Sequence, residues 1–255
     1  MTPREAVRTL AAAERLLVAL DFDGTLAPLQ DDPMASRMTP DAAAAVAALV
    51  AAPKTTVAFV SGRALRDLRV IAEHDDDSSI LLAGSHGAEQ WPADAEITSD
   101  GAAEAVRDEL TARAAAAVSG YEGAWIEHKA FGFALHTRRA APAAAREAAR
   151  AVDAIVAATA PEWRRRTGHD VLEFSFREEG KDAAVAHLRR LTEATAVLFA
   201  GDDVTDEDAL RSLGPADVGV RVGPGETAAA VRVRDITELA EMLVRLARER
   251  TLARQ

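Results

Sequence analysis

Short apolar runs that end in polar or glycine-containing turns dominate the pattern along the chain. Four such runs lie at residues 16–20, 55–60, 79–84 and 196–201. Runs of this length without polar alternation are typical of strands that are buried on both faces of a parallel sheet. Ala-rich stretches between them predict helices at residues 41–52, 63–73 and 182–194. The pattern therefore predicts an α/β core with a doubly wound, mainly parallel sheet.

The middle of the chain has a different pattern. Two Ala-rich stretches predict helices at residues 101–119 and 143–159. Segments of mixed polarity predict half-exposed strands at residues 123–129, 131–137 and 171–176. Two helices with a few antiparallel strands are typical of a small α+β domain. Because parallel-type strands resume at residue 196, we expect residues 88–179 to be an insertion in a core formed by residues 1–87 and 180–255.

Composition and charge exclude several classes of protein. Lys and Arg total 30 against 41 for Asp and Glu, so the net charge is −11. This sign argues against nucleic-acid and anionic-membrane binding, because no basic stripe can replace phosphate counterions. The longest apolar run, residues 42–52, is too short to span a bilayer, and no signal-peptide pattern occurs at the start, so we expect a cytoplasmic protein. The absence of Cys excludes disulfides and thiolate metal sites.

Two carboxylates follow the first apolar run directly. Asp21 and Asp23 are separated by one residue, and Gly24 permits a tight turn after them. Ligands of doubly wound sheets bind outside the carboxyl ends of the strands. Two carboxylates there suit one nucleophile and one general acid/base. An Asp pair in a turn is common, however, so this interpretation depends on the partners of the pair.

A second acidic cluster, GDDVTDED, follows the last of the four runs. The dipole of a helix N-terminus accounts for the acids from Asp206 onward, but not for Asp202 and Asp203 at the strand end. If the strands are neighbours, Asp202 lies beside Asp21, and like charges ~4 Å apart repel by about 4 kcal/mol at an effective dielectric near 20. A cation must offset this repulsion. Hard oxygen ligands without Cys or a His pair predict Mg²⁺.

Ser61 in FVSGR and Lys181 in EEGKDAAV complete the set. A Ser-Gly turn and a Lys at a helix start are each ordinary alone. An Asp pair, a Ser, a Lys and an acid pair at strand ends, in that order, together predict phosphoryl chemistry. Only 3 of the 30 basic residues are Lys, which favours a role for Lys181 that needs a compact ammonium.

With these residues in place, the sequence resembles the haloacid dehalogenase-like (HAD) phosphatases. DFDGT, the Ser of VSGR, Lys181 and GDDVTD correspond to their four motifs in order, over essentially the whole chain. The resemblance implies a Rossmann-like core, and the insertion resembles the large α/β cap of one HAD branch. Within that branch GSHGAE, EHK, HTR, Glu173 and GDDVTDED are similar to the trehalose-6-phosphate phosphatases.

The resemblance implies a role for each motif residue. Asp21 attacks phosphorus and forms an aspartyl-phosphate, while Asp23 protonates the leaving sugar oxygen and then accepts a proton from water. Mg²⁺ is held by Asp21, the main chain of Asp23 and Asp202. Ser61 and Lys181 hold the phosphoryl oxygens. Asp203 and Asp206 support the site. The implied substrate contacts are Gly62, Arg63, His86, Gly87, Glu127, Lys129, His136, Arg138 and Glu173.

Strand periodicity in the insertion suggests how a sugar is bound. Glu127 and Lys129 share one face of a strand, His136 and Arg138 share a face of the next, and Glu173 lies on a third segment. Side chains that converge in this way bind sugar hydroxyls, although a salt-bridged, solvated sheet face would have the same pattern. We expect the three Trp residues, at positions 91, 125 and 163, in the hydrophobic core rather than in contact with sugar.

The resemblance implies hydrolysis of trehalose 6-phosphate, a small-molecule sugar phosphate, and functional pairing with a trehalose-6-phosphate synthase. One alternative is a capped HAD phosphatase for sucrose 6-phosphate or a mannosyl phosphoglycerate. Another is a non-catalytic protein: a phospho-accepting signalling domain or an idle partner of a sugar-phosphate synthase. Asp23 and the insertion argue against a signalling domain. The presence of every motif residue argues against an idle partner.

Overall fold

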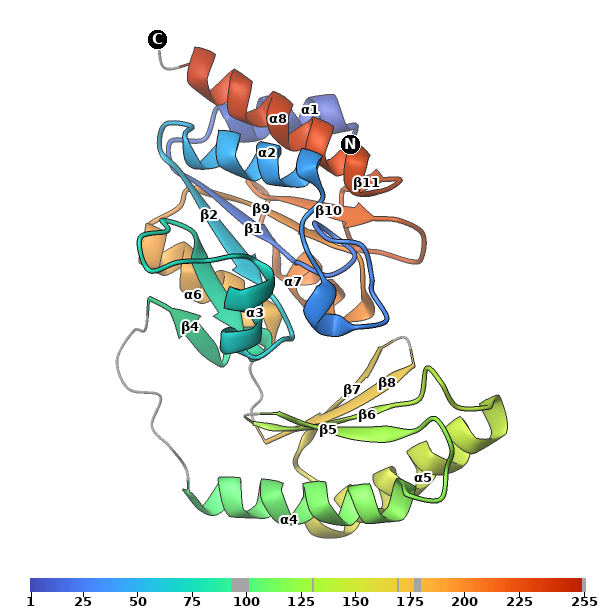
Figure 1. Cartoon of the computed structure of the whole chain (residues 1–255). Coiled ribbons are helices and arrows are strands. Elements are labelled where there is room, and N and C mark those ends of the chain that lie inside the picture. The colour runs from blue at the N-terminus through green and yellow to red at the C-terminus, as the bar shows by residue number, and fades with distance from the viewer. Residues whose placement is uncertain (93–100, 130, 169, 177–179, 254–255) are drawn as a thin grey trace. The chain divides into compact units, whose positions relative to one another are not determined.

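The computed structural model describes residues 1–92, 101–129, 131–168, 170–176 and 180–253 (Figure 1). The chain divides into two compact units. The first comprises Met1–Asp94 and Glu179–Gln255, and the second comprises Ala95–Glu178.

A mainly parallel sheet forms the centre of the first unit. Within the described residues it has seven strands, in the order β11-β10-β9-β1-β2-β3-β4. Their bounds are β1 Leu16–Leu20, β2 Thr55–Val60, β3 Leu81–Gly84, β4 Glu89–Trp91, β9 Ala196–Gly201, β10 Val218–Val222 and β11 Val231–Val233. β4 runs antiparallel to β3, and the other neighbours are parallel. The four predicted strands are confirmed. Leu20, the last residue of β1, pairs with Phe59 of β2 on one side and with Ala200 of β9 on the other. The segments that follow β1, β2 and β9 therefore meet at one edge of the sheet.

Helices cover both faces of this sheet (Figure 1). One layer holds α1 Pro3–Ala11, α2 Pro40–Val50, α3 Leu65–Ile71 and α8 Ile236–Leu252, and the other holds α6 Lys181–Thr192 and α7 Glu207–Ser212. Alternate residues of β1 explain this arrangement, because Leu16, Val18 and Leu20 pack into the first layer. Leu17 and Ala19 pack into the second. The predicted doubly wound α/β class is confirmed, since a strand buried on both faces needs helices on both sides.

Short helical turns lie close to three of the strand ends. Their bounds are η1 Pro33–Ala35, η2 Ser85–Gly87 and η3 Val204–Asp206. η2 follows β3 directly, and η3 follows β9 after two residues. Ser85 and His86 have φ values of 48° and 57°. Two consecutive side-chain-bearing residues in the left-handed region are strained, and such strain is typical of functional segments.

The second unit is a four-stranded antiparallel sheet with two helices on one face. Within the described residues the strand order is β5-β6-β8-β7. The bounds are β5 Trp125–Lys129, β6 Gly132–His136, β7 Arg164–Gly168, β8 Val171–Ser175, α4 Gly101–Val118 and α5 Pro142–Thr159. Phe133, Leu135, Leu172 and Phe174 pack against the two helices. The opposite face of this sheet carries mostly polar side chains.

No helix in the described part of the chain is both long enough and apolar enough to cross a membrane.

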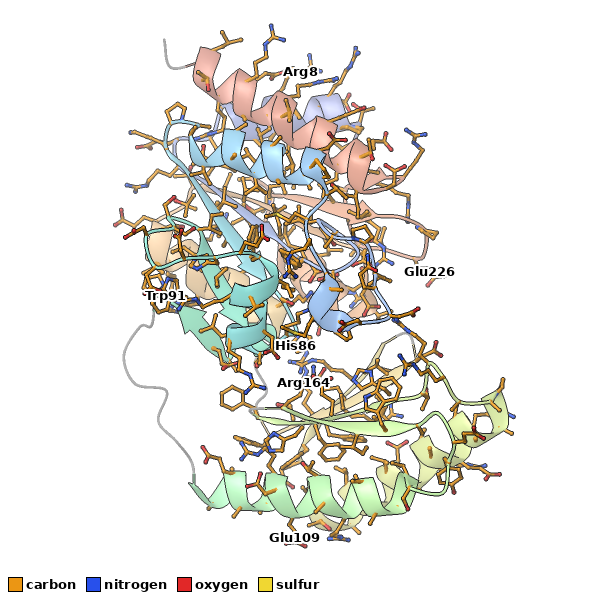
Figure 2. The ribbon with its side chains drawn as sticks, viewed as in Figure 1. Arg8, His86, Trp91, Glu109, Arg164 and Glu226 are labelled. Atoms are coloured by element: carbon orange, nitrogen blue, oxygen red, sulfur yellow. The ribbon has the colours of Figure 1, made fainter. Side chains whose placement is uncertain are left out.

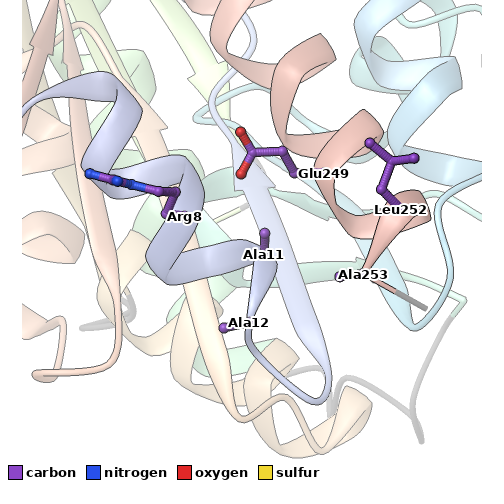
Figure 3. A pocket seen from close by; sticks show the side chains of 6 residues that line it. All are labelled: Arg8, Ala11, Ala12, Glu249, Leu252 and Ala253. Carbon is purple, nitrogen blue, oxygen red and sulfur yellow. The ribbon is translucent and has the colours of Figure 1, made fainter. Parts of the chain in front are cut away.

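A shallow hollow of about 410 Å³ lies between α1 and α8 (Figure 3). Its lining residues are Arg8, Ala11, Ala12, Glu249, Leu252 and Ala253. Because α1 ends just before β1 begins, this hollow lies at the amino edge of the sheet. The candidate chemical residues follow the carboxyl ends of the strands, so the hollow is not part of their site.

The side chain of Arg250 ties α8 to the segments that precede β1 and β2. Arg250 is fully buried. Its Nη1 donates to the carbonyl oxygens of Leu10 and Ala13, at 3.1 and 3.0 Å. Its Nη2 donates to the carbonyl of Lys54 at 2.7 Å, and its Nε donates to Thr55 Oγ1 at 2.7 Å. A guanidinium offers five N–H donors in a planar fork, against three on a compact ammonium, so one Arg side chain can satisfy buried oxygens from several segments at once.

We expect Arg250→Ala to lower the free energy of unfolding by about 3 kcal/mol or more, because buried carbonyl oxygens lose their donors and a cavity forms. Urea denaturation followed by circular dichroism measures this change. Arg248→Ala, at an exposed position of the same helix, is the control and should leave the midpoint unchanged. Equal midpoints for the two variants would contradict the role assigned to Arg250.

Candidate active site

β1 delivers Asp21 to the carboxyl edge of the sheet. The Asp21 amide donates to Ala200 O at 2.9 Å, which continues the ladder between β1 and β9. The turn that follows brings Asp202 very close, because a Cβ built on Gly24 would lie 2.0 Å from Asp202 Oδ2. Gly24 also has a φ of 83°. Only glycine fits this position, and its small size allows the predicted approach of the two acidic segments.

Lys181 lies between two buried carboxylates. Its Nζ donates to Asp21 Oδ1 and to Asp206 Oδ1, each at 2.6 Å. The Lys181 side chain is 3% exposed and the Asp206 side chain 0%. Burial acts to lower the pKa of Lys181, but the charges of Asp206 and Asp21 outweigh it and raise the pKa above its ordinary value. Lys181 is therefore a fixed positive charge beside Asp21.

Asp206 does more than place a negative charge at the N-terminus of a helix. Its Oδ2 accepts from the amides of Asp202 and Asp203, each at 2.9 Å, while Oδ1 accepts from Lys181. One buried carboxylate thus shapes the turn after β9 and orients the ammonium. Asp203 caps this turn, with Oδ1 accepting from the amide of Val204 at 2.7 Å.

Asp21, Asp202 and Asp206 form an acidic cluster, each with one carboxylate oxygen within 4.8 Å of the others. Burial raises the pKa of Asp202 to about 6, and the charge of Asp206 adds to the effect. Burial likewise raises the pKa of Asp21 well above its ordinary value, although Lys181 opposes this shift. Thr25 Oγ1 lies 3.2 Å from Asp21 Oδ2 and 3.3 Å from Asp202 Oδ1, between the two carboxylates.

The cluster fits a hard divalent cation. Three carboxylates against the single Lys181 ammonium leave two negative charges when all are ionised, and the donors are all oxygen. Asp206 Oδ2 accepts from two backbone amides and its Oδ1 from Lys181, whereas the Thr25 hydroxyl is the one described donor to Asp21 Oδ2, so Asp21 and Asp202 are the members best able to bind a metal. A cation at this point would offset the like-charge repulsion that adds to the effect of burial on the pKa values of Asp21 and Asp202.

The Asp23 side chain lies outside the acidic cluster. Arg63 donates to it through two nitrogens, with Nη2 2.7 Å from Oδ1, and Ser36 Oγ donates to Oδ1 at 2.8 Å. Ser36 is fully buried. Arg63 was predicted as a substrate contact, and in this structure its guanidinium binds the predicted acid/base. The role of the Asp23 main chain in metal binding stays a prediction.

Ser61 and the predicted loop residues around it pack together. Ser61 is 2% exposed, and its carbonyl accepts from the amide of His86 at 2.9 Å. His86 packs so closely on Gly62 that a Cβ there would lie 2.7 Å from the imidazole Cε1. A Cβ on Gly87 would lie 2.6 Å from Ala184 of α6, the helix that begins with Lys181. Figure 2 labels His86 in the turn after β3. These residues are therefore brought together in the first unit.

The predicted sugar-contact residues of the second unit also form a cluster. Lys129 Nζ lies 4.0 Å from an oxygen of Glu127 and 4.0 Å from an oxygen of Glu173. His136 Nε2 lies 2.6 Å from Glu127 Oε2. Burial acts to raise the pKa of Glu127, but the hydrogen bond with His136 and the charge of Lys129 hold it below its ordinary value. Glu127 is therefore ionised at neutral pH and available as a hydrogen-bond acceptor.

Arg138 and Trp125 differ from expectation. β6 ends at His136, so Arg138 lies beyond the strand and is exposed, and no hydrogen bond joins it to the described members of the Glu127 cluster. Trp125 is 40% exposed and stacks on His136 with ring centroids 4.7 Å apart. The prediction of a core position is wrong for Trp125, because it shares a face with Glu127 rather than with Ile126. Trp163 is 7% exposed, and its core position is confirmed.

Sequence reasoning missed Thr25 and Ser36. Thr25 belongs to DFDGT, and a hydroxyl four residues after Asp21 in a tight turn is a signal that could have found it. Ser36 carries no such signal, because its contact with Asp23 depends on how the segment before α2 folds back over β1.

Comparisons with known proteins identify the family of this chain. A sequence model of the trehalose-phosphatase family matches residues 19–235, from the end of β1 to beyond β11. The trehalose-phosphate phosphatase of Mycobacterium marinum is 34% identical over 249 residues, which cover 91% of this chain and 62% of that relative. The chain therefore spans less than two thirds of the length of that relative.

Solved structures share the fold. The C-terminal domain of a Candida albicans trehalose-6-phosphate phosphatase superposes with a TM-score of 0.78 at 20% identity, covering 96% of each chain. A haloacid dehalogenase-like hydrolase from B. subtilis superposes with a TM-score of 0.58 at 14% identity, covering 89% of this chain and 98% of that one. At these identities the likeness concerns the fold alone, and it confirms the predicted fold class. The match of the family model along most of the sequence goes further: the chain belongs to the trehalose-phosphatase family.

Proposed function

We propose that this protein is a phosphatase that hydrolyses trehalose 6-phosphate to trehalose and phosphate, with Mg²⁺ as its metal. The observation that carries the proposal is the buried cluster in which the Lys181 ammonium binds Asp21 and Asp206 beside Asp202. A fixed positive charge and a carboxylate at strand ends suit transfer of a phosphoryl group, which depends mostly on position and electrostatics.

Asp21 is the nucleophile and Asp23 the acid/base in the proposed reaction. An Asp21 oxygen bonds to phosphorus while the bond from phosphorus to the sugar oxygen breaks, and Asp23 gives that oxygen a proton. Water then attacks the aspartyl-phosphate, Asp23 accepts the proton of the water, and phosphate leaves. Because Arg63 and Ser36 hold Asp23 outside the acidic cluster, its carboxylate has to turn away from the guanidinium to reach the leaving oxygen.

Other residues of the first unit hold the phosphoryl group. Asp21 and Asp202 would bind Mg²⁺, with the main chain of Asp23 as a further ligand, and the ion would neutralise negative charge on the phosphoryl oxygens. The Lys181 ammonium and the Ser61 hydroxyl orient the same oxygens. Asp203 and Asp206 hold the turn that carries Asp202.

We assign sugar recognition to the predicted insertion, residues 88–179, which contains the second unit Ala95–Glu178, as a cap on a catalytic core formed by residues 1–87 and 180–255. Glu127, Lys129 and Glu173 offer acceptors and a donor for hydroxyl groups within one cluster. The Glu127 carboxylate is further oriented by His136. Gly62, Arg63, His86 and Gly87 stay predicted substrate contacts of the core, and Arg138 stays a predicted contact of the cap.

The substrate also indicates the preceding reaction. Trehalose 6-phosphate requires a glycosyl transfer onto a hexose phosphate, so we propose functional pairing with a trehalose-6-phosphate synthase. We place both steps in the cytoplasm, where nucleotide sugars and hexose phosphates are available.

A substrate panel tests the proposed function directly. With Mg²⁺ we expect phosphate release from trehalose 6-phosphate at a higher kcat/KM than from sucrose 6-phosphate or glucose 6-phosphate. EDTA should abolish release, and added Mg²⁺ should restore it. Asp21→Asn, which keeps the side-chain volume, should fold normally and release no phosphate. Preference for another sugar phosphate would overturn the substrate, and wild-type rates in Asp21→Asn would overturn the nucleophile.

Lys181→Arg tests whether the compact ammonium is required. The planar guanidinium fork cannot occupy the position 2.6 Å from both Asp21 and Asp206 without displacing one of them, so we expect kcat to fall about 10²- to 10³-fold. The exposed Lys54→Arg is the matched control and should keep normal turnover. If Lys181→Arg also turns over normally, charge alone matters at this position.

Variants of the second unit should separate sugar recognition from phosphoryl chemistry. Glu127→Gln and Glu173→Gln should raise KM for trehalose 6-phosphate, while slow hydrolysis of p-nitrophenyl phosphate, which has no sugar, should survive. His128→Gln is the control, because His128 lies on the opposite face of β5 and contacts Asp108. Parallel loss of both activities would instead indicate that the two Glu residues serve folding.

A further inference from the structure

The sheet of the second unit has one face that the helices do not cover. Strand register places Glu127 opposite Ala134, Ala134 opposite Glu173, and Glu173 opposite Arg166. These four residues therefore form one row across the sheet, in the order β5, β6, β8, β7. Their neighbours Ile126, Phe133, Leu135, Leu172 and Phe174 point the other way, into the core with α4 and α5.

A small residue in β6 makes the row continuous. Ala134, on this face, carries only a methyl group and leaves room above the strand. Lys129 from β5 uses this room and reaches to 4.0 Å from Glu173 on β8. Larger side chains in β6 would separate the polar groups of β5 from those of β8. The polar side chains of β5 and β8 therefore form one continuous polar surface on this face rather than two isolated ion pairs.

Arginine side chains of β7 extend this polar surface. Arg164 and Arg166 alternate with Arg165 along the strand, and both are partly buried. Figure 2 shows Arg164 on the side of the sheet away from α4 and α5. Arg165 points the other way, where its Nε donates to Asp153 of α5 at 2.7 Å. The three consecutive arginines therefore divide between the two faces, and only Arg164 and Arg166 share a face with Glu173.

We propose that Arg166 is a specificity-determining residue that binds sugar hydroxyl groups together with Glu173. This inference rests on the proposed function and extends its sugar-binding face by one strand. A carboxylate only accepts hydrogen bonds and a guanidinium only donates them. Adjacent hydroxyls of a sugar do both. Glu173 and Arg166, side by side in register, therefore offer an acceptor and a donor to one pair of hydroxyls, and charge on both partners strengthens each bond.

A different reason for arginines on β7 is protection of the sheet edge. β7 is the last strand of the described order, and charged side chains on an edge strand discourage pairing with another chain. This role is served equally by Arg164, Arg165 and Arg166, and it predicts no effect on substrate binding. The two roles can therefore be separated by comparing neighbouring positions of the same strand.

Arg166→Gln and the matched control Arg165→Gln make this comparison in the full chain. For trehalose 6-phosphate we expect Arg166→Gln to raise KM about 10- to 100-fold, the loss of a charge-assisted hydrogen bond, with a smaller change in kcat. Arg165→Gln should leave KM unchanged. Hydrolysis of p-nitrophenyl phosphate should be unaffected in both. In the double variant Arg166→Gln/Glu173→Gln, KM should rise by less than the product of the two single-variant increases, because both residues bind the same hydroxyls.

The outcomes distinguish this inference from the proposed function. If wild-type protein prefers another sugar phosphate, the proposed substrate is wrong, and the same KM comparison made with the preferred sugar phosphate decides the role of Arg166. Equal KM values for Arg166→Gln and wild type would overturn the inference while trehalose 6-phosphate hydrolysis stands. Loss of p-nitrophenyl phosphate hydrolysis together with a lower melting temperature would assign Arg166 to folding. Hydrolysis of aryl phosphates alone by the wild type would overturn both.

Discussion

Burial of carboxylates at one edge of a parallel sheet is the constraint on which the rest of this structure depends. Asp21 and Asp206 are both buried, and burial of a carboxylate is costly unless a cation accompanies it. Lys181 supplies part of that compensation with two hydrogen bonds of 2.6 Å. Lys181 is also the first residue of α6, so the position of this helix, and the close contact of Gly87 with Ala184, are tied to the ion pairs.

The two units use the same residue types for different physical tasks. Lys181 and its carboxylates are buried, which makes their interaction strong and their positions fixed. Lys129 lies 4.0 Å from both Glu127 and Glu173, at the outer limit of an ion pair, so these contacts are weak and exchangeable. A rigid charged centre suits a reaction in which charge moves at one phosphorus atom. A loosely paired polar face suits hydroxyl groups, which replace the existing partners one for one.

Much of the fold could be predicted because its strands are buried on both sides. The runs that became β1, β2, β3 and β9 are mostly apolar, and the polar residues that follow them mark the site. α8 was not predicted, although Leu239, Leu243 and Leu246 follow a helical period that could have revealed it. β7 offered no signal, because RRRTG has neither an apolar run nor alternation, and it is a strand only because β8 pairs with it.

The sequence by itself determined the chemistry of the site: which carboxylates follow strands, the Ser and Lys between them, and the family to which their order belongs. Only the tertiary structure decided how those groups pair. Asp206 lies four residues after Asp202 and 25 residues after Lys181, yet it binds both, because β9 ends and α6 begins at the same edge. Arg63 binds Asp23 across 40 residues of sequence, and Arg166 lies beside Glu173 through the pairing of β7 with β8. Such contacts depend on strand order and register, which are set by packing of the whole sheet rather than by any local pattern.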